Sequence, residues 1–384
     1  MAEPVPAMKI PFVDLHPQYL EVKQRVDDSL AKIIGSSSFI GGGAVKEFEA
    51  ALAKEEARKF AVGVKSGTAA LELVFEGLGL SPGAEIVTTT HTAVPTVEAI
   101  VRAGFKPILC DIDPATYQIS ADAVAAAVTS RTAVLLPVHL YGLPAPLREI
   151  SALAGRKGLT LVEDVAQAQG ATLDGKRVGT WGEAACFSFF PSKCLGGFGD
   201  SGAVTTDGEA LASKVRALSN HGRLEKFTHE IVGVNERIDT LQAAVLSAKL
   251  PRLADWNAMR RRAAGWYMDG LAGVGDIVLP QVPQGAEPAW HLFVVRTGNR
   301  DALSKHLSAR GVQTGMHYPV PVHLHPAYAD LGYGKGAFPE AEAAAGSILS
   351  LPIYPHITEG QVAYVVEQVT GYFGKGTAAS RRTG

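Results

Sequence analysis

The sequence predicts an α/β protein with a large domain built on a mostly parallel sheet and a smaller α+β domain at its C-terminal end. From about residue 60, short β-branched runs alternate with helical stretches, beginning with FAVGV, TAALELVFEGLGL, EIVTTT, VPTVEAIVRAG and KPILCDID. Such alternation is typical of βαβ units around a parallel sheet. The 384 residues also exceed what one hydrophobic core usually serves. We therefore expect a large domain at 12–248, a small domain at 249–376 and a disordered tail at 377–384.

The predicted elements follow one another without an obvious linker. A helical stretch at 18–35 comes first, and we expect it to pack near the small domain. After KPILCDID the alternation continues through ADAVAAAV, TAVLLPVHLY, APLREISALAGRKG, LTLVEDVAQ, AACFSFF and GAVTT. The turn residues SPG at 81–83 and Ser120, as the N-cap of ADAVAAAV, support two of the breaks. A helical stripe from LQAAVLSAKL is then interrupted at Pro251, and the strand WHLFVVRT and further helices follow.

Composition limits the partners and the compartment. The 36 Lys and Arg against 38 Asp and Glu give a formal charge of −2, without a basic block that could follow a nucleic acid. No apolar run approaches the roughly 18 residues of a membrane-spanning helix, and the N-terminus lacks the pattern of a signal peptide. Cys110, Cys186 and Cys194 have no CxxC spacing, which argues against a metal site or disulfide framework. We expect a cytoplasmic protein that binds neither nucleic acid, membrane nor metal.

Residues that follow the predicted strands form the candidate site, because ligands bind beyond the carboxyl ends of the strands in an open parallel sheet. After FAVGV, Gly67 and Thr68 open a helix whose free N–H groups would hold a phosphate, although SGT alone fits an ordinary N-cap equally well. The strand LTLVED ends at Asp164, a carboxylate that needs a cationic partner. Taken alone, Asp164 is explained more simply by a salt bridge or a helix cap.

The strand AACFSFF leads to Ser188 and then to Lys193 in the turn PSKCLGGFGDSG. A lysine beside a cleft can have its pKa lowered by desolvation, so that the neutral amine can form an imine, although a loop lysine paired with an acid is the simpler alternative. An anion-binding helix start, a buried acid and a lysine, each at a strand end, are what pyridoxal phosphate (PLP) requires for its phosphate, ring nitrogen and aldehyde. We therefore predict a PLP site on Asp164 and Lys193.

Five motifs, SGTAAL, VEDVAQAQGA, FSFFPSKCLGGFGDSG, GVNERIDTLQAAVL and HYPVPVHL, together resemble the DegT/DnrJ/EryC1/StrS family of sugar aminotransferases. The resemblance runs from PFVDL to SLPIYP, nearly the whole chain, and implies the PLP-dependent aspartate aminotransferase type of fold (fold type I). It implies that Lys193 binds the cofactor aldehyde, that Asp164 pairs with the ring nitrogen and that Gln167 lies against the ring near its phenolic oxygen.

The resemblance further implies how the phosphate is held and how subunits assemble. Gly67, Thr68 and Ser188 would bind the phosphate, and Asn235 would reach it from the neighbouring subunit of a homodimer with composite sites. From the residues alone, Asn235 is equally explained as a helix N-cap before ERIDTLQAAVL.

The sequence departs from the commoner family pattern in three places. Cys194 follows the lysine where Asn is frequent, and Gln169 replaces a frequent His. Ala93 stands where many members place an aromatic ring over the cofactor, which leaves His91 as a substitute.

The implied reaction takes an amino group from an amino acid, expected to be L-glutamate, leaves it on the cofactor as pyridoxamine phosphate (PMP), and passes it to a keto sugar carried on a nucleotide diphosphate. The product would serve amino-sugar biosynthesis. HYPVPVHL resembles members that act on 3-keto sugars, and a 4-keto substrate is the alternative. Arg223, His317, Tyr318 and His323 are the substrate-binding candidates, and each could equally pack between domains.

Two further functions compete with this one. A sugar dehydratase of the same fold would carry histidine in place of Lys193, so the lysine argues against it. A regulatory protein is the other, since relatives have at times been described as regulatory or sensory. A regulator has no need of the lysine, the acid and the phosphate cradle together, and no DNA-binding basic helix is apparent.

Overall fold

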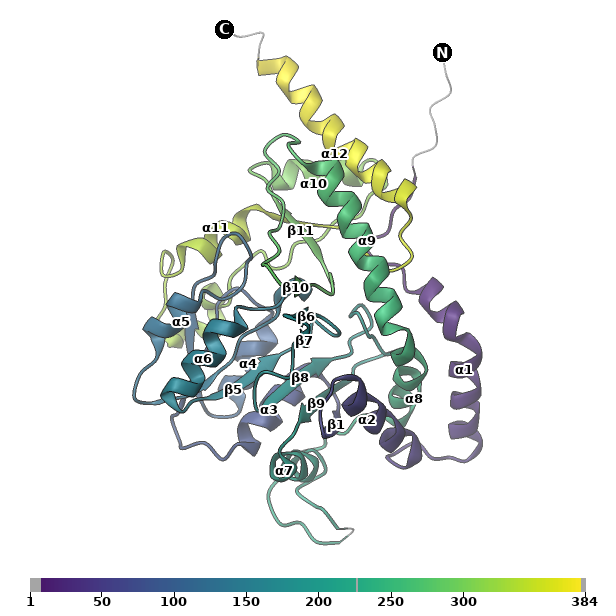
Figure 1. Ribbon diagram of the computed structural model, residues 1–384, viewed down its shortest axis with the longest axis vertical. Helices are drawn as coiled ribbons and strands as arrows, with labels where there is room; N and C mark the ends of the chain where they lie inside the picture. The colour runs from purple at the N-terminus through teal and green to yellow at the C-terminus, as the bar shows by residue number, and fades with distance from the viewer. Residues whose placement is uncertain (1–7, 226, 381–384) are drawn as a thin grey trace.

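A computed structural model describes residues 8–225 and 227–380. Its centre is a seven-stranded sheet (Figure 1). The order across the sheet is β1 (Phe60–Val64), β9 (Gly202–Thr206), β8 (Ala184–Ser188), β5 (Thr160–Asp164), β4 (Thr132–Leu135), β2 (Glu85–Thr89) and β3 (Lys106–Cys110). All neighbouring pairs from β8 to β3 are parallel, and β9 runs antiparallel to both of its neighbours. The predicted, mostly parallel sheet is confirmed.

Helices connect and cover these strands. Those between strands are α3 (Gly67–Gly77), α4 (Val94–Arg102), α5 (Ala121–Ala127), α6 (Leu147–Lys157) and α7 (Glu209–Ser219), with the short turn η1 (Leu140–Gly142) after β4. Further helices, α1 (His16–Gly35), α2 (Gly43–Glu55) and α8 (Thr240–Lys249), lie together at one side of the molecule (Figure 1). The predicted first helix therefore packs on α8, which precedes the C-terminal part of the chain. The predicted interruption at Pro251 is the short η2 (Leu250–Arg252) before α9 (Leu253–Leu271).

The C-terminal part is built around an antiparallel pair, β11 (Phe293–Arg296) and β12 (Ile348–Leu351). Around it lie α9, α10 (Arg300–Ser308), the turns η3 (Val322–Leu324) and η4 (Pro326–Leu331), α11 (Pro339–Ser347) and α12 (Glu359–Ser380). A small sheet of β10 (Ala286–Glu287), β6 (Thr172–Leu173) and β7 (Lys176–Arg177) links the two parts. Ile10 packs in the C-terminal core, so the N-terminal segment joins it.

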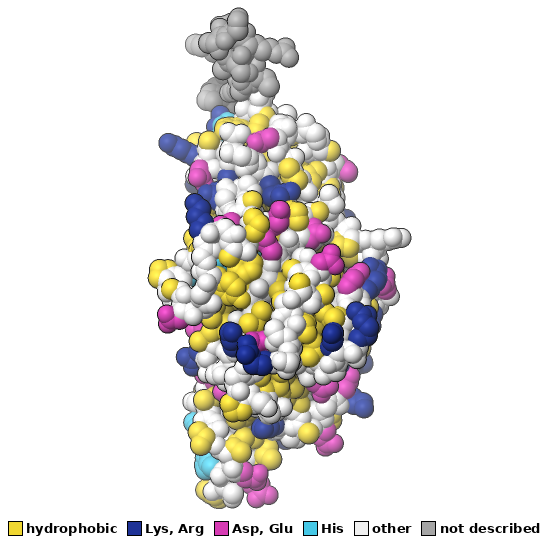
Figure 2. All heavy atoms as spheres, turned by 90° about the vertical axis from the view of Figure 1, so that its left-hand side faces the viewer, with side chains coloured by type: hydrophobic (Ala, Val, Ile, Leu, Met, Phe, Trp, Pro, Cys, Tyr) yellow, Lys and Arg dark blue, Asp and Glu magenta, His cyan; other side chains and the backbone are white. Residues whose placement is uncertain are grey.

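Four further features are the C-terminal end, membrane-spanning helices, metal-binding groups and the distribution of surface charge. The tail predicted at 377–384 overlaps the last turn of α12, and residues 381–384 lie outside the described part. Within the described ranges, no helix is both long and apolar enough to cross a membrane, and no group of three or more His, Cys, Asp or Glu side chains could hold a metal ion. Figure 2 shows positive and negative side chains interspersed over one face.

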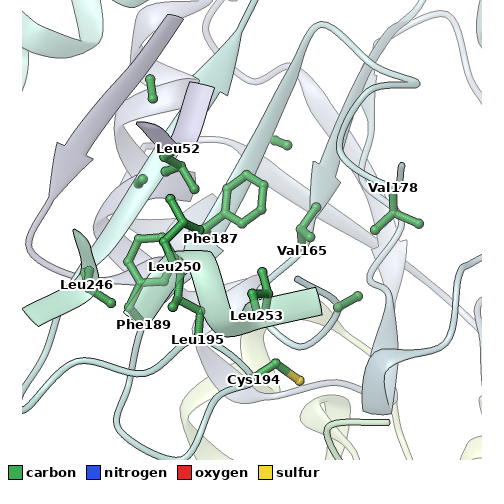
Figure 3. Packing of buried hydrophobic residues seen from close by; sticks show 14 of the residues in the cluster. Leu52, Val165, Val178, Phe187, Phe189, Cys194, Leu195, Leu246, Leu250 and Leu253 are labelled. Carbon is green, nitrogen blue, oxygen red and sulfur yellow. The ribbon is translucent and has the colours of Figure 1, made fainter. Parts of the chain in front are cut away.

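A hydrophobic cluster anchors the turn that carries Lys193 (Figure 3). Phe189, before the turn, and Cys194 and Leu195, after the lysine, are all fully buried in it, against Leu250 of η2. Within the turn, the Lys193 amide donates to the carbonyl of Phe190 at 2.8 Å. Because residues before and after Lys193 are buried, the backbone position of the lysine is fixed beyond the end of β8.

Candidate active site

One pocket, of about 270 Å³, lies at the carboxyl ends of the central strands. Six of the predicted residues line it: Gly67, Thr68, Asp164, Gln167, Ser188 and Lys193. They come from three chain segments far apart in sequence, which the parallel topology brings to one edge of the sheet. The remaining predicted residues, Asn235, Arg223, His317, Tyr318 and His323, are not among its lining residues.

Lys193 is the only lysine among the lining residues of this pocket. Burial disfavours its ammonium form and lowers its pKa to about 8, although the charge of Asp164 acts in the opposite direction. An amine with such a pKa is neutral in about a fifth of molecules at pH 7.4, and the neutral amine is the form that attacks an aldehyde.

Asp164 ends β5 and is 4% exposed. Burial raises its pKa above the usual value for aspartate, while hydrogen bonds from Ala166 and Thr96 and the charge of Lys193 partly offset this effect. The Ala166 amide donates to Oδ1 at 3.1 Å, and the Thr96 hydroxyl donates to Oδ2 at 2.9 Å. Since each carboxylate oxygen has two lone pairs, acceptor sites remain for a ligand in the pocket.

The start of α3 can hold an anion. Ser66 is the N-cap of α3, and its hydroxyl accepts from the Ala69 amide at 3.1 Å. The amides of Gly67 and Thr68 precede the first intrahelical hydrogen bond and so have no partner within the helix. A Cβ at Gly67 would lie 2.8 Å from the Cβ of Ser188, so only glycine allows the helix start to approach this hydroxyl. Two unpaired amides beside a hydroxyl suit a phosphate group.

Gln167 is held in one orientation by two tyrosines. Its Oε1 accepts from the Tyr141 amide at 2.7 Å, and its Nε2 donates to the Tyr318 hydroxyl at 3.3 Å. Gln169, which replaces the frequent histidine, donates from Nε2 to the carbonyl of Ser188 at 2.6 Å. Gln167 lines the pocket itself, and Gln169 holds the backbone of Ser188, another lining residue.

The loop HYPVPVHL lies beyond this pocket, and its members differ in their surroundings. Tyr318 contacts the pocket through Gln167, and burial raises the pKa of its phenol to about 12. His317 stacks on Phe12 and shares a hydrogen bond of 2.8 Å with Ser350; burial and then the charge of Lys193 lower its pKa to about 4.

His323 has both ring nitrogens engaged within the protein. They lie 2.7 Å from the Thr90 hydroxyl and 3.1 Å from Glu342, and the residue is 2% exposed. The packing alternative fits these contacts better than substrate binding. Arg223 lies in the loop after α7, outside the pocket lining, and Asn235 follows that loop as an exposed residue bridged to Asn220.

Ser66, which opens the helix with Gly67 and Thr68, also lines the pocket. Several other lining residues were not predicted, among them Thr92, Thr96, Phe190 and Asp200. Thr92 and Thr96 follow the strand EIVTTT, so its strand end indicates their neighbourhood, whereas the hydrogen bond from Thr96 to Asp164 appears only in the fold. Ala93 lines the pocket as its position suggested, whereas His91 does not. The Nε2 of His91 instead lies 2.8 Å from the Tyr141 hydroxyl, and burial lowers the pKa of His91 to about 4.

The residues of this pocket have the chemistry that PLP needs. An amine with a lowered pKa, a buried carboxylate with free acceptor sites and an unpaired helix N-terminus beside a serine match the aldehyde, ring nitrogen and phosphate of that cofactor. Together with the sheet topology, they define a PLP-dependent enzyme.

Comparison with known proteins gives the family. The model of the DegT/DnrJ/EryC1/StrS aminotransferase family matches residues 21–370, and the chain belongs to this family. It is 46% identical, over 94% of its length and 98% of the relative, to the erythromycin biosynthesis sensory transduction protein EryC1 of Saccharopolyspora erythraea. It is 44% identical, over 94% of its length and 95% of the relative, to the dTDP-3-amino-3,4,6-trideoxy-alpha-D-glucose transaminase of Streptomyces venezuelae.

Comparison with solved structures gives the same family of folds. The fold superposes on DesV of S. venezuelae with a TM-score of 0.93 at 43% identity, covering 96% of this chain and 99% of that one. It superposes on NtdA of Bacillus subtilis, solved with bound cofactor PMP, with a TM-score of 0.89 at 30% identity, covering 95% and 85%. The predicted fold class, the aspartate aminotransferase type with a smaller C-terminal domain, is confirmed by these neighbours.

Proposed function

We propose that the protein is a PLP-dependent aminotransferase that moves an amino group from L-glutamate to a keto sugar carried on a nucleotide diphosphate. The observation that carries the proposal is the meeting of Lys193, Asp164 and the open helix start of α3 around one pocket. Family membership and the names of the relatives support the nucleotide-sugar substrate. A location in the cytoplasm is part of the proposal, and the three free cysteines suit a reducing compartment.

The chain's own residues divide the chemistry among them. PLP, when bound, supplies an electron sink for the negative charge that develops at the donor Cα. The Lys193 amine would hold the cofactor through its aldehyde and would serve as the base for the proton of the donor Cα. The Asp164 carboxylate would hold a proton at the ring nitrogen, the amides of Gly67 and Thr68 would bind the phosphate, and Gln167 would lie near the phenolic oxygen.

The sugar carbon that receives the amine is proposed to be C3. The HYPVPVHL loop and the 44% identity to a transaminase named for a 3-amino sugar support this choice, and C4 is the alternative. Tyr318 is the substrate contact that the geometry favours, since its hydroxyl accepts from Gln167 and so keeps its own hydrogen for a sugar oxygen or phosphate.

The direct test incubates the purified protein with PLP, L-glutamate and dTDP- or UDP-linked 3-keto and 4-keto sugars, and identifies the products by NMR. The proposal expects a 3-amino sugar and equimolar 2-oxoglutarate. A 4-amino product would overturn the assignment to C3 alone. Failure to bind PLP would overturn the enzyme and favour a regulatory role, the one suggested by the name of the EryC1 relative.

A homodimer with composite sites is also part of the proposal. The described parts of the loop after α7, 221–225 and 227–234, project from the body of the protein (Figure 1) and expose 85% of Phe227 and 96% of Val232. A second copy of the chain would cover these apolar side chains. Asn235, at the end of this loop and outside its own pocket lining, would then reach the phosphate of the partner's site.

Subunit complementation tests the composite site. Lys193→Ala and Asn235→Ala are each expected to be impaired, and hybrids formed by co-expression should regain activity above both parents. The gain arises because one of the two sites in a hybrid then combines an intact Lys193 with an intact Asn235. Hybrid dimers without any gain would place Asn235 in its own subunit's site, and a monomer by sedimentation would remove the dimer altogether.

A further inference from the structure

Two threonines connect the start of α4 to Asp164. The hydroxyl of Thr96 lies 2.9 Å from Asp164 Oδ2, and the hydroxyl of Thr92 lies 2.9 Å from that of Thr96. An ionised carboxylate only accepts, so Thr96 is the donor to Asp164. Because the single hydrogen of Thr96 is used there, Thr92 must donate to Thr96. The two hydrogen bonds therefore run in one direction, towards the carboxylate.

The local sequence frees both hydroxyls for this task. The N-cap of α4 is Ala93, which makes no side-chain cap, and Pro95 in the first turn has no N–H to satisfy. A threonine at a helix start ordinarily caps the backbone, yet here Thr92 and Thr96 flank the cap and bond to side chains. Both are 2% exposed and line the pocket, so water competes little for their hydrogens.

The surroundings of Asp164 make this donor important. Only the Ala166 amide and Thr96 donate to it among the described residues, and burial works against its charge. The nearby titratable groups are Lys193, whose charge favours the ionised form, and His139, whose Nδ1 accepts from the Ala145 amide and so carries no proton. Cys186 and Tyr318 are also near, and burial raises the pKa of each, so both stay neutral. Among the residues that the structure describes, Thr96 is thus the one neutral side chain that donates directly to the carboxylate.

We propose that Thr96, oriented by Thr92, is a positioning residue that keeps Asp164 ionised and aimed at the ring nitrogen of the cofactor. The purpose assigned to it rests on the proposed function. The hydrogen-bond chain itself belongs to the protein without cofactor, and it can be tested there.

The test measures unfolding free energy against pH for the protein without cofactor. Four proteins are compared: wild type, Asp164→Asn, Thr96→Val and the double variant. Because burial raises the pKa of folded Asp164, the stability of wild type relative to Asp164→Asn falls as pH rises and levels off above that pKa. Thr96→Val and the double variant form the second pair, in which the carboxylate has lost a hydrogen bond. The pH at which their stability difference levels off should therefore be about 1 to 2 units higher.

Three further variants separate positioning from packing. Thr96→Ser retains the hydroxyl and should restore the wild-type profile, and Thr92→Val should shift it in the same direction as Thr96→Val but less. Thr88→Val is the matched control, because this buried threonine of β2 donates at 2.8 Å to the Leu136 carbonyl and not to Asp164. It should lower stability at every pH without moving the profile.

The second measurement is the dissociation constant of PLP as a function of pH. As pH falls, PLP binding should begin to weaken at a higher pH in Thr96→Val than in wild type. An unchanged profile in Thr96→Val, no recovery in Thr96→Ser, or an equal shift in Thr88→Val would overturn the proposal. If Thr96→Val does not fold, an unshifted profile in Thr92→Val would overturn it. A wild type that binds no PLP contradicts the proposed function instead, and leaves the cofactor-free profiles to decide on Thr96.

Discussion

Two adjacent residues of β5, Glu163 and Asp164, are both buried carboxylates and yet have opposite environments. Glu163 accepts from the amides of Gly179, Trp181 and Gly182 at 2.7–2.8 Å, and from His139 at 3.2 Å. Burial alone would raise its pKa, but the hydrogen bonds from His139 and the backbone lower it overall. Asp164 has two donors, and its pKa stays raised.

The state of His139 follows from its own contacts. Its Nδ1 accepts from the Ala145 amide at 3.0 Å, so Nε2 carries the proton that is donated to Glu163. Glu163 is therefore saturated by the protein and ties the turn at 178–182 to the sheet. A buried carboxylate with all of its acceptor sites filled is structural, whereas one with unfilled sites facing a pocket is available to a ligand.

Replacement of Asp164 should have the largest effect, and it should fall on catalysis. Asp164→Asn is expected to lower turnover by about 10² to 10⁴, because the ring nitrogen loses the carboxylate that keeps it protonated. The unfolding midpoint should stay unchanged or rise, since a costly buried charge is removed. Steady-state kinetics and thermal unfolding of the same preparation measure both, and full turnover in Asp164→Asn or Asp164→Ala would remove the role assigned here.

Replacement of Glu163 should act on stability instead. Glu163→Gln leaves at least one buried amide without its acceptor and should cost about 3 kcal/mol of unfolding free energy. Glu183→Gln is the matched control, because Glu183 directly follows the turn at 178–182 and is exposed. Chemical denaturation measures the difference. A stable Glu163→Gln with strongly reduced turnover would mean that the two carboxylates share one function.

A third buried carboxylate, Glu56 after α2, extends the comparison. It is 1% exposed, neither oxygen has a hydrogen-bond partner within the described residues, and burial raises its pKa to about 7. In the unfolded chain the group ionises at lower pH, so its stabilising effect is complete in acid and is lost as pH rises towards 7.

Glu56→Gln should therefore stabilise the protein by up to about 3 kcal/mol at pH 8 and have little effect at pH 4. Denaturation curves at both pH values test this, with Glu55→Gln as the neighbouring control, because Glu55 pairs with Arg177 near the surface. Equal effects of Glu56→Gln at the two pH values would show that folding does not raise the pKa of Glu56.

The smallest effect is expected at an exposed carboxylate. Asp174 pairs with Arg148, and both side chains are more than 40% exposed. Asp174→Asn should leave turnover and the unfolding midpoint unchanged, because solvent screens such a pair. A clear loss of stability would mean that exposure is a poor guide to the importance of the carboxylates compared here.

The sequence alone could predict the parts of the site that strand ends present. Lys193, Asp164, Gly67 and Ser188 each follow a recognisable strand, and parallel strands end at one edge, so their meeting was predictable. Thr96 was not singled out, because its role depends on a side-chain hydrogen bond across 68 residues of chain. A threonine in a first helical turn has the same local pattern whether it bonds to a carboxylate or to water.

The substrate candidates show the same limit. His323 occurs in a motif typical of a binding loop, yet its nitrogens meet Thr90 and Glu342, which only the packed structure brings close. Its neighbour Tyr318 contacts Gln167 from the same loop. Local sequence therefore located the loop but could not tell which of its side chains face the pocket.

Transamination requires that Lys193 binds the PLP aldehyde and that the amino group of the donor passes to the cofactor. The most direct measurement is the absorption spectrum of the purified protein with PLP before and after addition of L-glutamate, for wild type and for Lys193→Ala. Wild type should be yellow and should bleach to a pyridoxamine spectrum with glutamate, and Lys193→Ala should form no such lysine-bound band. A wild type that binds no PLP, or a Lys193→Ala variant with the same spectrum and the same response, would contradict it.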